Sequence, residues 1–359
     1  MEKMKAALMY GPSDIRVEDI DKPECPEDGL LINVRAIGLC GSDIRNLTSD
    51  SMPGGYPHVY GHEVVGVIVE KGDKVTQDYE LGDKIYVYPV DHCGKCEACR
   101  SGHSEMCENG GDYTHRQGGF ADYYVVTGTQ LSRDSVFKLD PKQDEVAATL
   151  AEPLSSVYAC QDNIDVSFGN TVVIIGAGPI GCFHVQLAKL RGAEKVIMIE
   201  LNETRLEMAK RFGADLYINS SAEDPVKAVL DFTNGKGADK VISANPSTES
   251  QNQALYMAKR NGTVVWFGGV PKGKTAEVDS NRVHYYGLWI YGHYGANSIQ
   301  VEKSFHLALS DQFEASKFIT HILPLSQINE GIRLTKTGEA IKVVLIPNEE
   351  INKDLLKRS

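Results

Sequence analysis

Four cysteines fall within one fifteen-residue stretch of this chain, with the spacing C-x2-C-x2-C-x7-C. Four thiolates so spaced can close a tetrahedron around one Zn²⁺ and leave no open position, which predicts a structural metal site. An iron–sulfur cluster takes the same ligands, and disulfides are the other alternative, although a large chain of this kind favours metal over disulfides. The four residues are Cys93, Cys96, Cys99 and Cys107.

A second set of metal-ligand types is dispersed along the chain. Cys40 lies in a Gly-Leu-Cys-Gly-Ser-Asp segment, His62 in Gly-His-Glu, and Glu152 in Ala-Glu-Pro-Leu. Singly, each is unremarkable, since a lone cysteine is usually a buried apolar residue and a glutamate before proline usually lies in a turn. Together they offer sulfur, nitrogen and oxygen donors. That combination is typical of a catalytic zinc that keeps one exchangeable position.

A glycine-rich turn with the pattern G-x-G-x-x-G runs from Gly176 to Gly181. It follows an apolar strand-like run and opens a helical pattern, with Pro179 at the first helical position. Gly176 permits a tight turn, Gly178 has no side chain to keep a pyrophosphate away, and Gly181 lets the helix pack closely on the strand. Ile180 lies within the same turn. The helix N-terminus would then present unpaired N–H groups to phosphates.

An acidic residue follows this turn at the spacing that a ribose contact requires. Glu200 ends the next predicted strand, nineteen residues after Gly181. A carboxylate there accepts hydrogen bonds from ribose hydroxyls and repels a 2′-phosphate, so the sequence predicts NAD rather than NADP. Arg205 lies five residues further on and could neighbour the same ribose.

The composition fits an ordinary globular enzyme. The chain has 359 residues, 42% of them hydrophobic, and a net charge of −12. That length suggests about two domains. The acidic balance argues against a nucleic-acid binder and against attachment to anionic lipid. No apolar run has the length of a membrane span, and the N-terminus has no signal-peptide pattern, so we expect a cytoplasmic protein.

The pattern of secondary structure changes near residue 156. Before it, short strands alternate with turns and predict an irregular, mostly antiparallel β domain. After it, strands alternate with helices, which predicts a six-stranded parallel sheet covered on both faces. The tail after about residue 296 is expected to return to the first domain. The predicted domains are thus 1–155 completed by 297–359, and 156–296.

These motifs, in this order, resemble those of the zinc-dependent medium-chain dehydrogenase/reductase superfamily. The resemblance covers most of the chain, and the glutamates after His62 and before Pro153 resemble the polyol branch, which contains sorbitol, galactitol-phosphate and threonine dehydrogenases. It implies an α/β fold made of a discontinuous GroES-like β domain and a doubly wound Rossmann domain, with the active site in the cleft between them. It also implies a homodimer or homotetramer that binds a small alcohol, and neither nucleic acid nor a membrane.

The resemblance assigns roles to individual residues. Cys40 and His62 would ligate the catalytic zinc, and Glu63 and Glu152 would share the oxygen ligation, with the direct ligand left open. Asp43 would accept the N–H of His62 and fix its tautomer. Ser42 would pass the proton from the substrate alcohol. Zinc would favour the alkoxide, and hydride would pass to the nicotinamide ring. Two zinc ions per chain are expected, one catalytic and one structural.

One position departs from the pattern of many relatives. They carry a histidine five residues after the zinc cysteine, as the last protein member of the proton relay, and here that position is Arg45. An arginine stays protonated and cannot act as a base. Arg45 could contact the cofactor pyrophosphate, bind an anionic substrate group, or have no role. We favour the contact with the pyrophosphate.

Three functions remain open on the sequence alone. The first is an NAD-dependent zinc dehydrogenase for a polyol or other secondary alcohol. The second is a related sugar-alcohol-phosphate or threonine-type dehydrogenase, and the third is a non-catalytic dinucleotide-binding protein on the same fold. The presence of Cys40, His62 and Glu152 favours the enzymes.

Overall fold

The computed structural model describes residues 2–46, 55–111 and 117–358. The chain folds into two units, one made of Met1–Ser155 and Ala296–Ser359 and the other of Ser156–Gly295. Helix α5 (Ala151–Asn163) spans the point at which the chain passes from the first unit to the second. Among the described helices, none is both long enough and apolar enough to cross a bilayer.

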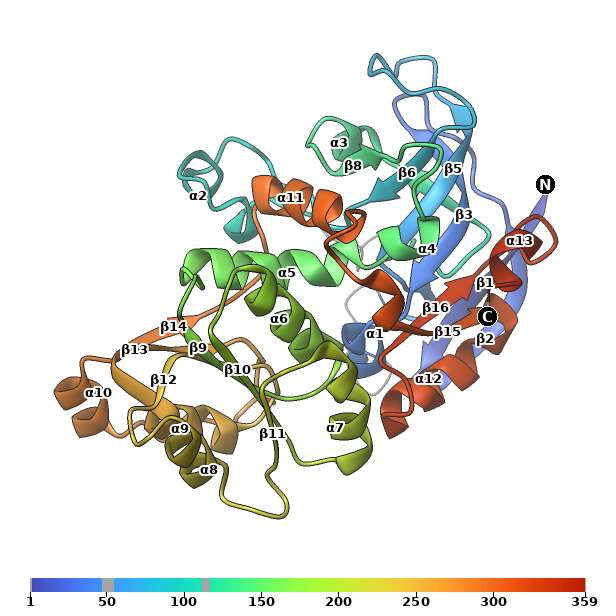
Figure 1. Ribbon diagram of the computed structural model, residues 1–359. Helices are drawn as coiled ribbons and strands as arrows, with labels where there is room; N and C mark the ends of the chain where they lie inside the picture. The colour runs from blue at the N-terminus through green and yellow to red at the C-terminus, as the bar shows by residue number, and fades with distance from the viewer. Residues whose placement is uncertain (1, 47–54, 112–116, 359) are drawn as a thin grey trace. The chain divides into compact units, whose positions relative to one another are not determined.

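The first unit is built mainly of antiparallel strands (Figure 1). One sheet has the order β2-β1-β4, and the larger has the order β15-β16-β3-β5-β6-β8, with β7 also paired to β3. Its strands are β1 Lys3–Gly11, β2 Asp14–Asp21, β3 Leu30–Gly38, β4 His58–Val59, β5 Glu63–Lys71, β6 Lys84–Val87, β7 Tyr123–Val126, β8 Val136–Lys138, β15 Ile319–Pro324 and β16 Lys342–Ile346. Its helices are α1 Gly41–Asn46, α2 Glu97–Arg100, α3 Gly128–Leu131, α4 Glu145–Ala148, α11 Ser298–Ala308, α12 Ile328–Thr337 and α13 Lys353–Leu356.

The C-terminal tail completes the larger sheet of this unit. Strand β16 pairs with β3 in antiparallel register, Leu345 opposite Ile37, and β15 pairs with β16 in parallel register. The residues of β16 are all buried because the strand lies inside the sheet. The tail from Ala296 onwards thus belongs to the first unit of the structure.

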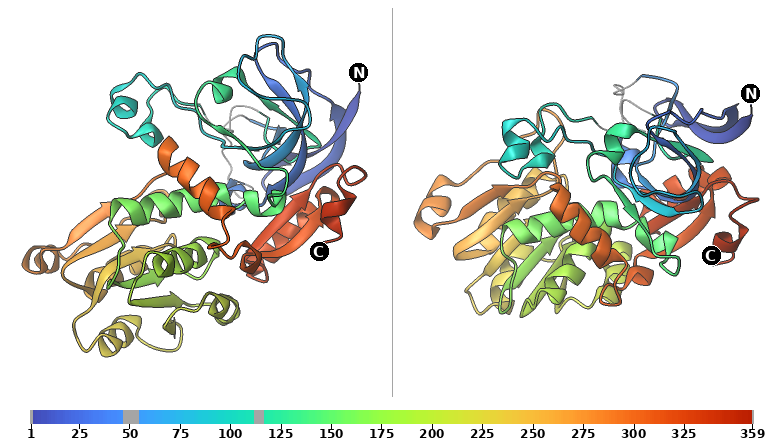
Figure 2. Two further views of the ribbon diagram at one scale, coloured as in Figure 1. Left: turned by 45° about the horizontal axis from the view of Figure 1, so that its top comes forward. Right: turned by 90° about the horizontal axis from the view of Figure 1, so that it is seen from above.

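The second unit contains one parallel sheet with the order β11-β10-β9-β12-β13-β14. In chain order this is 3-2-1-4-5-6, the doubly wound arrangement, and helices lie on both faces (Figure 2). The strands are β9 Thr171–Ile175, β10 Lys195–Glu200, β11 Leu216–Asn219, β12 Ala238–Ser243, β13 Ala258–Trp266 and β14 Trp289–Gly292. The helices are α6 Pro179–Leu190, α7 Glu203–Ala209, α8 Pro225–Phe232, α9 Thr248–Met257 and α10 Ser280–Tyr286.

The central strands of this sheet are apolar because helices cover both of their faces. The residues of β9 after Thr171 are buried, and so are those of β10 after Lys195. The carboxyl end of β9 leads directly into the glycine-rich turn and then into α6. The sheet thus holds the phosphate-binding turn at its carboxyl edge, where doubly wound sheets bind ligands.

Candidate active site and metal centres

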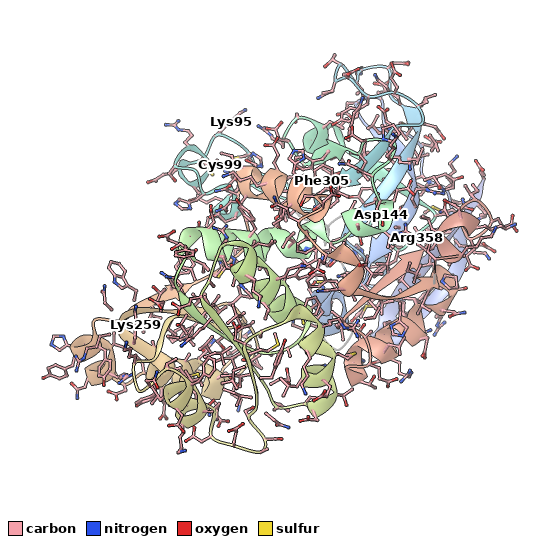
Figure 3. The ribbon with its side chains drawn as sticks, in the orientation of Figure 1. Lys95, Cys99, Asp144, Lys259, Phe305 and Arg358 are labelled. Carbon is pink, nitrogen blue, oxygen red and sulfur yellow. The ribbon has the colours of Figure 1, made fainter. Side chains whose placement is uncertain are left out.

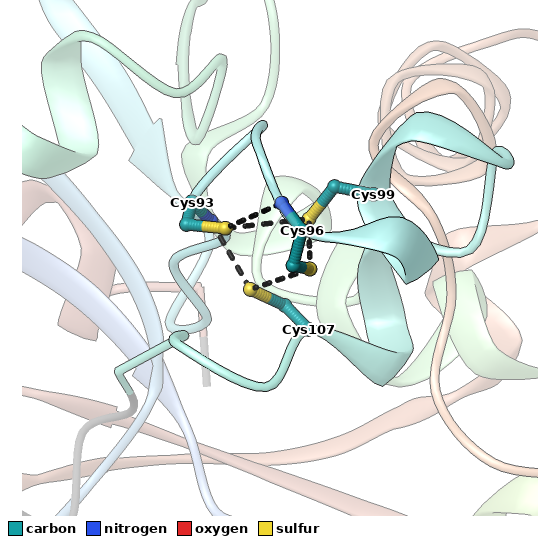
Figure 4. A group of neighbouring side chains, drawn as sticks. All are labelled: Cys93, Cys96, Cys99 and Cys107. Atoms are coloured by element: carbon teal, nitrogen blue, oxygen red, sulfur yellow. Dashed lines mark hydrogen bonds between the residues drawn. The ribbon is translucent and has the colours of Figure 1, made fainter.

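The structure brings together the four cysteines of the predicted structural site, two of them on or beside the short helix α2 (Figure 4). All eight cysteines of the chain are free thiols, so the disulfide alternative is wrong. The sulfur atom of Cys96 lies 3.5 Å from that of Cys99 and 3.9 Å from that of Cys107, and the sulfurs of Cys93 and Cys99 are 4.0 Å apart. Tetrahedral zinc thiolates place their sulfurs about 3.8 Å apart, from Zn–S bonds of about 2.3 Å. The cluster therefore fits one zinc ion.

Backbone N–H groups in the lobe stabilise thiolate charge. The N–H groups of Lys95 and Cys96 donate to the sulfur of Cys93, at 3.4 and 3.3 Å, and they lower the pKa of Cys93 to about 6. Burial instead raises the pKa of Cys99 to about 12. Four neighbouring thiols cannot all ionise without a cation, so a bound metal ion would stabilise the ionised cluster.

Replacing Cys96 by serine is expected to remove the structural zinc and to lower the thermal midpoint by several degrees, while kcat per folded molecule changes little. The reason is that this lobe has little apolar content and depends on the metal for its order. Differential scanning calorimetry with zinc analysis measures both effects. Cys25→Ser, at a half-buried thiol outside both clusters, is the control. A variant that retains its zinc and midpoint would contradict the assignment.

The dispersed ligands also converge, within the first unit. Cys40, His62, Glu63 and Glu152 each offer one donor atom, and these atoms all lie within 4.8 Å of one another. Cys40 immediately precedes α1, His62 and Glu63 lie at the start of β5, and Glu152 lies in the first turn of α5. His62 is 4% exposed and Glu63 is fully buried, whereas one-fifth of the Glu152 side chain is exposed.

Asp43 fixes two of the proposed ligands. Its Oδ1 lies 3.1 Å from Nδ1 of His62, and its Oδ2 accepts the backbone N–H of Cys40 at 3.0 Å. With Nδ1–H donating to Asp43, the Nε2 atom of His62 is left to bind a metal, as metal-ligating histidines require. Ser42 Oγ lies 3.4 Å from that Nε2 atom, so the hydroxyl adjoins the metal position.

The charges at this cluster favour a cation. Burial alone would lower the pKa of His62, but the negative charges of Asp43, Cys40 and Glu152 outweigh burial and hold it well above its ordinary value. Burial raises the pKa of Glu152 to about 7, with Glu63 adding to the effect and His62 opposing it. A buried carboxyl that is pushed towards its neutral form, beside other anionic donors, is in an environment that a divalent ion stabilises.

A buried lysine that the sequence analysis missed neutralises Glu63. The ammonium of Lys342, on β16, lies 2.5 Å from each oxygen of Glu63, and its side chain is 3% exposed. Gly38 makes room for this pair, because a Cβ at that position would lie 1.7 Å from Glu63 Oε2. Lys342 and Glu63 are 279 residues apart in the sequence, so no local pattern could have revealed the pair.

The glycine-rich turn has the geometry that its sequence predicts. Gly176 has a φ of +114°, and a Cβ at Gly181 would lie 1.8 Å from the carbonyl oxygen of Gly176. At Gly178 a Cβ would meet nothing within 4 Å, which leaves open space beside the first turn of α6. Pro179 is the first residue of that helix, and Ile180 follows it. The turn is therefore shaped to accept a phosphate group at a helix N-terminus.

Glu200 holds this turn to the end of β10. Its Oε2 accepts the N–H of Ala177 at 2.8 Å, and its Oε1 accepts the N–H groups of Leu201 and Asn202, each at 3.0 Å. A carboxylate has about four acceptor positions, so one is left for a ribose hydroxyl. Arg205 lies half-buried on α7, whose N-terminus is capped by the side chain of Asn202.

Comparisons with known proteins agree with this geometry. Residues 26–135 match the family model described as an alcohol dehydrogenase GroES-like domain, and residues 179–310 match the model of a zinc-binding dehydrogenase. An L-threonine 3-dehydrogenase of Symbiobacterium thermophilum is 32% identical, over 97% of this chain and 99% of that protein. An erythritol/L-threitol dehydrogenase of Mycolicibacterium smegmatis is 29% identical, over 96% and 98%.

A solved structure gives the same result. A zinc-binding dehydrogenase from Sinorhizobium meliloti, bound to NADP, superimposes with a TM-score of 0.88 and 30% identity over 97% of this chain and 100% of that chain. The chain thus belongs to the zinc-dependent medium-chain dehydrogenase superfamily, in its polyol branch. It is an oxidoreductase that exchanges hydride between an alcohol and a nicotinamide cofactor.

Proposed function

We propose that this enzyme oxidises a polyol or another secondary alcohol with NAD, at a zinc ion held by Cys40, His62 and Glu152. The observation that carries the proposal is the convergence of these donors on one anionic point, at which His62 is buried and Cys40 and Glu152 are partly exposed. Glu63 is the remaining donor, but both of its oxygens already contact the ammonium of Lys342. Glu152 therefore has the freer oxygens and is the better candidate for direct ligation.

The residues around this point have separate tasks in the reaction. When bound, zinc acts as a Lewis acid that lowers the pKa of the substrate alcohol. Asp43 keeps His62 in the tautomer that leaves Nε2 free. Ser42, whose hydroxyl adjoins Nε2, accepts the proton of the alcohol and passes it outward. A nicotinamide cofactor, when bound, would supply the ring that accepts the carbinol hydrogen as hydride.

Two zinc ions per chain follow from the two donor sets. The four-cysteine lobe is closed and structural, and the Cys40–His62–Glu152 site is open and catalytic. Arg45 lies exposed on α1, three residues after Ser42. We assign its fixed positive charge to the pyrophosphate of the cofactor. The alternative, that Arg45 binds an anionic substrate, is tested by including phosphorylated polyols among the substrates.

The preferred cofactor depends on Glu200. Replacing Glu200 by alanine is expected to lower the ratio of kcat/KM for NAD to that for NADP by about tenfold or more, equivalent to about 1.4 kcal/mol. The ribose would lose an acceptor, and a 2′-phosphate would no longer meet a negative charge. Steady-state kinetics with both cofactors measure the ratio, and Glu207→Ala on the exposed side of α7 is the control. A wild-type enzyme that uses NADP equally well would contradict the proposal.

The substrate is found by following NAD reduction with zinc present. The panel contains short and sugar-length polyols, their phosphates and threonine, because relatives of this chain are named for erythritol and threonine. We expect turnover of a neutral polyol or simple secondary alcohol. A strong preference for phosphorylated polyols would assign Arg45 to binding the substrate phosphate. A preference for threonine would favour a threonine-type dehydrogenase. No turnover of any alcohol would contradict the proposal.

We also propose that the chain forms a homo-oligomer. Strand β14 lies at the edge of the six-stranded sheet, and Trp289 on it is 69% exposed. An exposed edge with a large apolar side chain is suited to pairing with a second copy. Light scattering measures the subunit number.

A further inference from the structure

A buried serine on α11 contacts the first turn of α5, which carries Glu152. Ser304 is fully buried. Its hydroxyl is shared between two backbone carbonyl oxygens, that of Val301 at 2.7 Å and that of Ala151 at 3.2 Å. A serine inside a helix commonly bonds to its own helix, as Ser304 does to Val301. The contact with Ala151, 153 residues away in the sequence, joins two helical segments of the first unit.

The Ala151 carbonyl belongs to the peptide group that contains the backbone nitrogen of Glu152. That group is planar, so its orientation fixes one side of the Glu152 backbone. On the other side, the carbonyl oxygen of Glu152 accepts a hydrogen bond from Ser155 Oγ at 2.6 Å. The two peptide groups that flank the Cα atom of Glu152 are thus each held by a serine hydroxyl, one from α5 itself and one from α11.

The local sequence does not favour the helical conformation of Glu152. A residue before proline prefers extended backbone, because the proline ring crowds it. Glu152 precedes Pro153, yet it lies within α5. Contacts from outside α5 therefore add to the stability of this turn, and the Ser304 hydroxyl supplies one at the adjoining residue.

The helix that carries Ser304 is itself held in place. The next residue, Phe305, is labelled in Figure 3, and its ring stacks on Tyr86 of β6, with 5.5 Å between ring centroids, and on Phe137 of β8, at 5.2 Å. Phe305 is buried, and β6 and β8 belong to the larger sheet of the first unit. The stack therefore packs α11 against that sheet, and Ser304 is a donor in a fixed place.

We propose that Ser304 is a positioning residue for Glu152: its hydrogen bond to the Ala151 carbonyl holds the first turn of α5 where the Glu152 carboxylate reaches the metal position. A carboxylate oxygen of Glu152 lies within 4.8 Å of the donor atoms of Cys40 and His62. A rotation of the turn would change these distances, because the side chain extends from the backbone that Ser304 holds. This inference rests on the role given to Glu152 in the proposed function, and it assigns Ser304 no contact with substrate, cofactor or metal.

The test is Ser304→Ala, which removes only the hydroxyl. We expect kcat to fall about fivefold, less than the roughly 10–100-fold typical of residues bonded directly to a metal ligand, because Ser304 acts through the backbone. KM for NAD should stay within about twofold. The visible absorption spectrum of the cobalt-substituted enzyme should shift, and a chelator should remove the ion of the open site faster, because the oxygen ligand is held less firmly.

Ser310→Ala is the matched control. Its hydroxyl donates to the carbonyl oxygen of Leu307 at 2.8 Å, so this variant loses the same one-turn bond that Ser304 makes to Val301. It should lower the thermal midpoint to a similar extent. It should leave kcat, the cobalt spectrum and the rate of chelation unchanged.

For Ser304→Ala, a kcat and a cobalt spectrum like those of the wild-type protein would overturn the inference, and so would a control variant that reproduces the losses. Glu152→Gln separates the inference from the proposed function. If Glu152→Gln changes the cobalt spectrum while Ser304→Ala does not, only the inference fails. If Glu152→Gln leaves the spectrum and kcat unchanged, Glu152 is not a ligand and both fail.

Discussion

Replacing His62 by alanine is expected to lower kcat by about a thousandfold or more and to remove one of two zinc ions. A Lewis-acid metal contributes several kcal/mol to stabilising the reacting oxygen, and each 1.36 kcal/mol is tenfold in rate. Loss of the imidazole leaves Cys40 and Glu152 as an incomplete ligand set. Steady-state kinetics and zinc analysis on the same preparation measure the two losses together.

The fold of the His62 variant should survive, because the structural zinc lobe is untouched. His284→Ala, at an exposed histidine on α10, is the matched control and should retain full activity and both zinc ions. A His62 variant with more than a tenth of the wild-type kcat would show that the reaction does not depend on this ligand.

Replacing Lys342 by methionine is expected to destabilise the metal-free protein by about 3–5 kcal/mol, because a buried carboxylate is left without its partner. Glu63 is fully buried, and the ammonium of Lys342 contacts both of its oxygens. Zinc should restore part of the loss, since the released carboxylate can then bind the ion. Urea unfolding of the chelated and the zinc-loaded protein measures the difference.

Two further variants isolate the pair. Glu63→Gln combined with Lys342→Met should be less destabilised than Lys342→Met alone, since no charge is left buried. Lys303→Met, at an exposed lysine of α11, controls for the loss of a positive charge. Equal stability of Lys342→Met and the wild-type protein, with and without zinc, would contradict the role given to the pair.

The features predicted well from the sequence are those set by nearby residues. The positive φ of Gly176 and the close packing at Gly181 follow from the glycine pattern itself. The four cysteines are also close in sequence, and their spacing alone predicts the sulfur cluster. The doubly wound order of the second unit follows from the alternation of strands and helices.

The features missed depend on partners far away in the chain. In the sequence, Lys342 resembles any other strand residue. Its role becomes visible only in the sheet, where β16 pairs with β3 and β3 pairs with β5, which begins at Glu63. Glu152 lies in the first turn of α5 rather than in an isolated turn, where Pro153 is tolerated because the first helical N–H groups need no partner.

Several element boundaries depend on pairing that the sequence pattern does not show. The pattern predicts a strand over 263–269, but β13 begins at Ala258, which pairs with Ala238 at the start of β12. A helix predicted over 250–259 ends at Met257. The pattern predicts no strand over 319–324, where β15 forms by pairing with β16. A strand predicted over 119–126 is regular only from Tyr123.

Elemental analysis during chelation tests the central claim most directly. The account predicts two zinc ions per chain in the freshly purified protein. A chelator should remove one of them first, with dehydrogenase activity lost in proportion, because three protein ligands and an exchangeable position hold an ion less tightly than four thiolates. The folded chain should retain the other ion in its four-cysteine lobe. Iron with sulfide in that lobe, or activity that persists after the first zinc is gone, would contradict it.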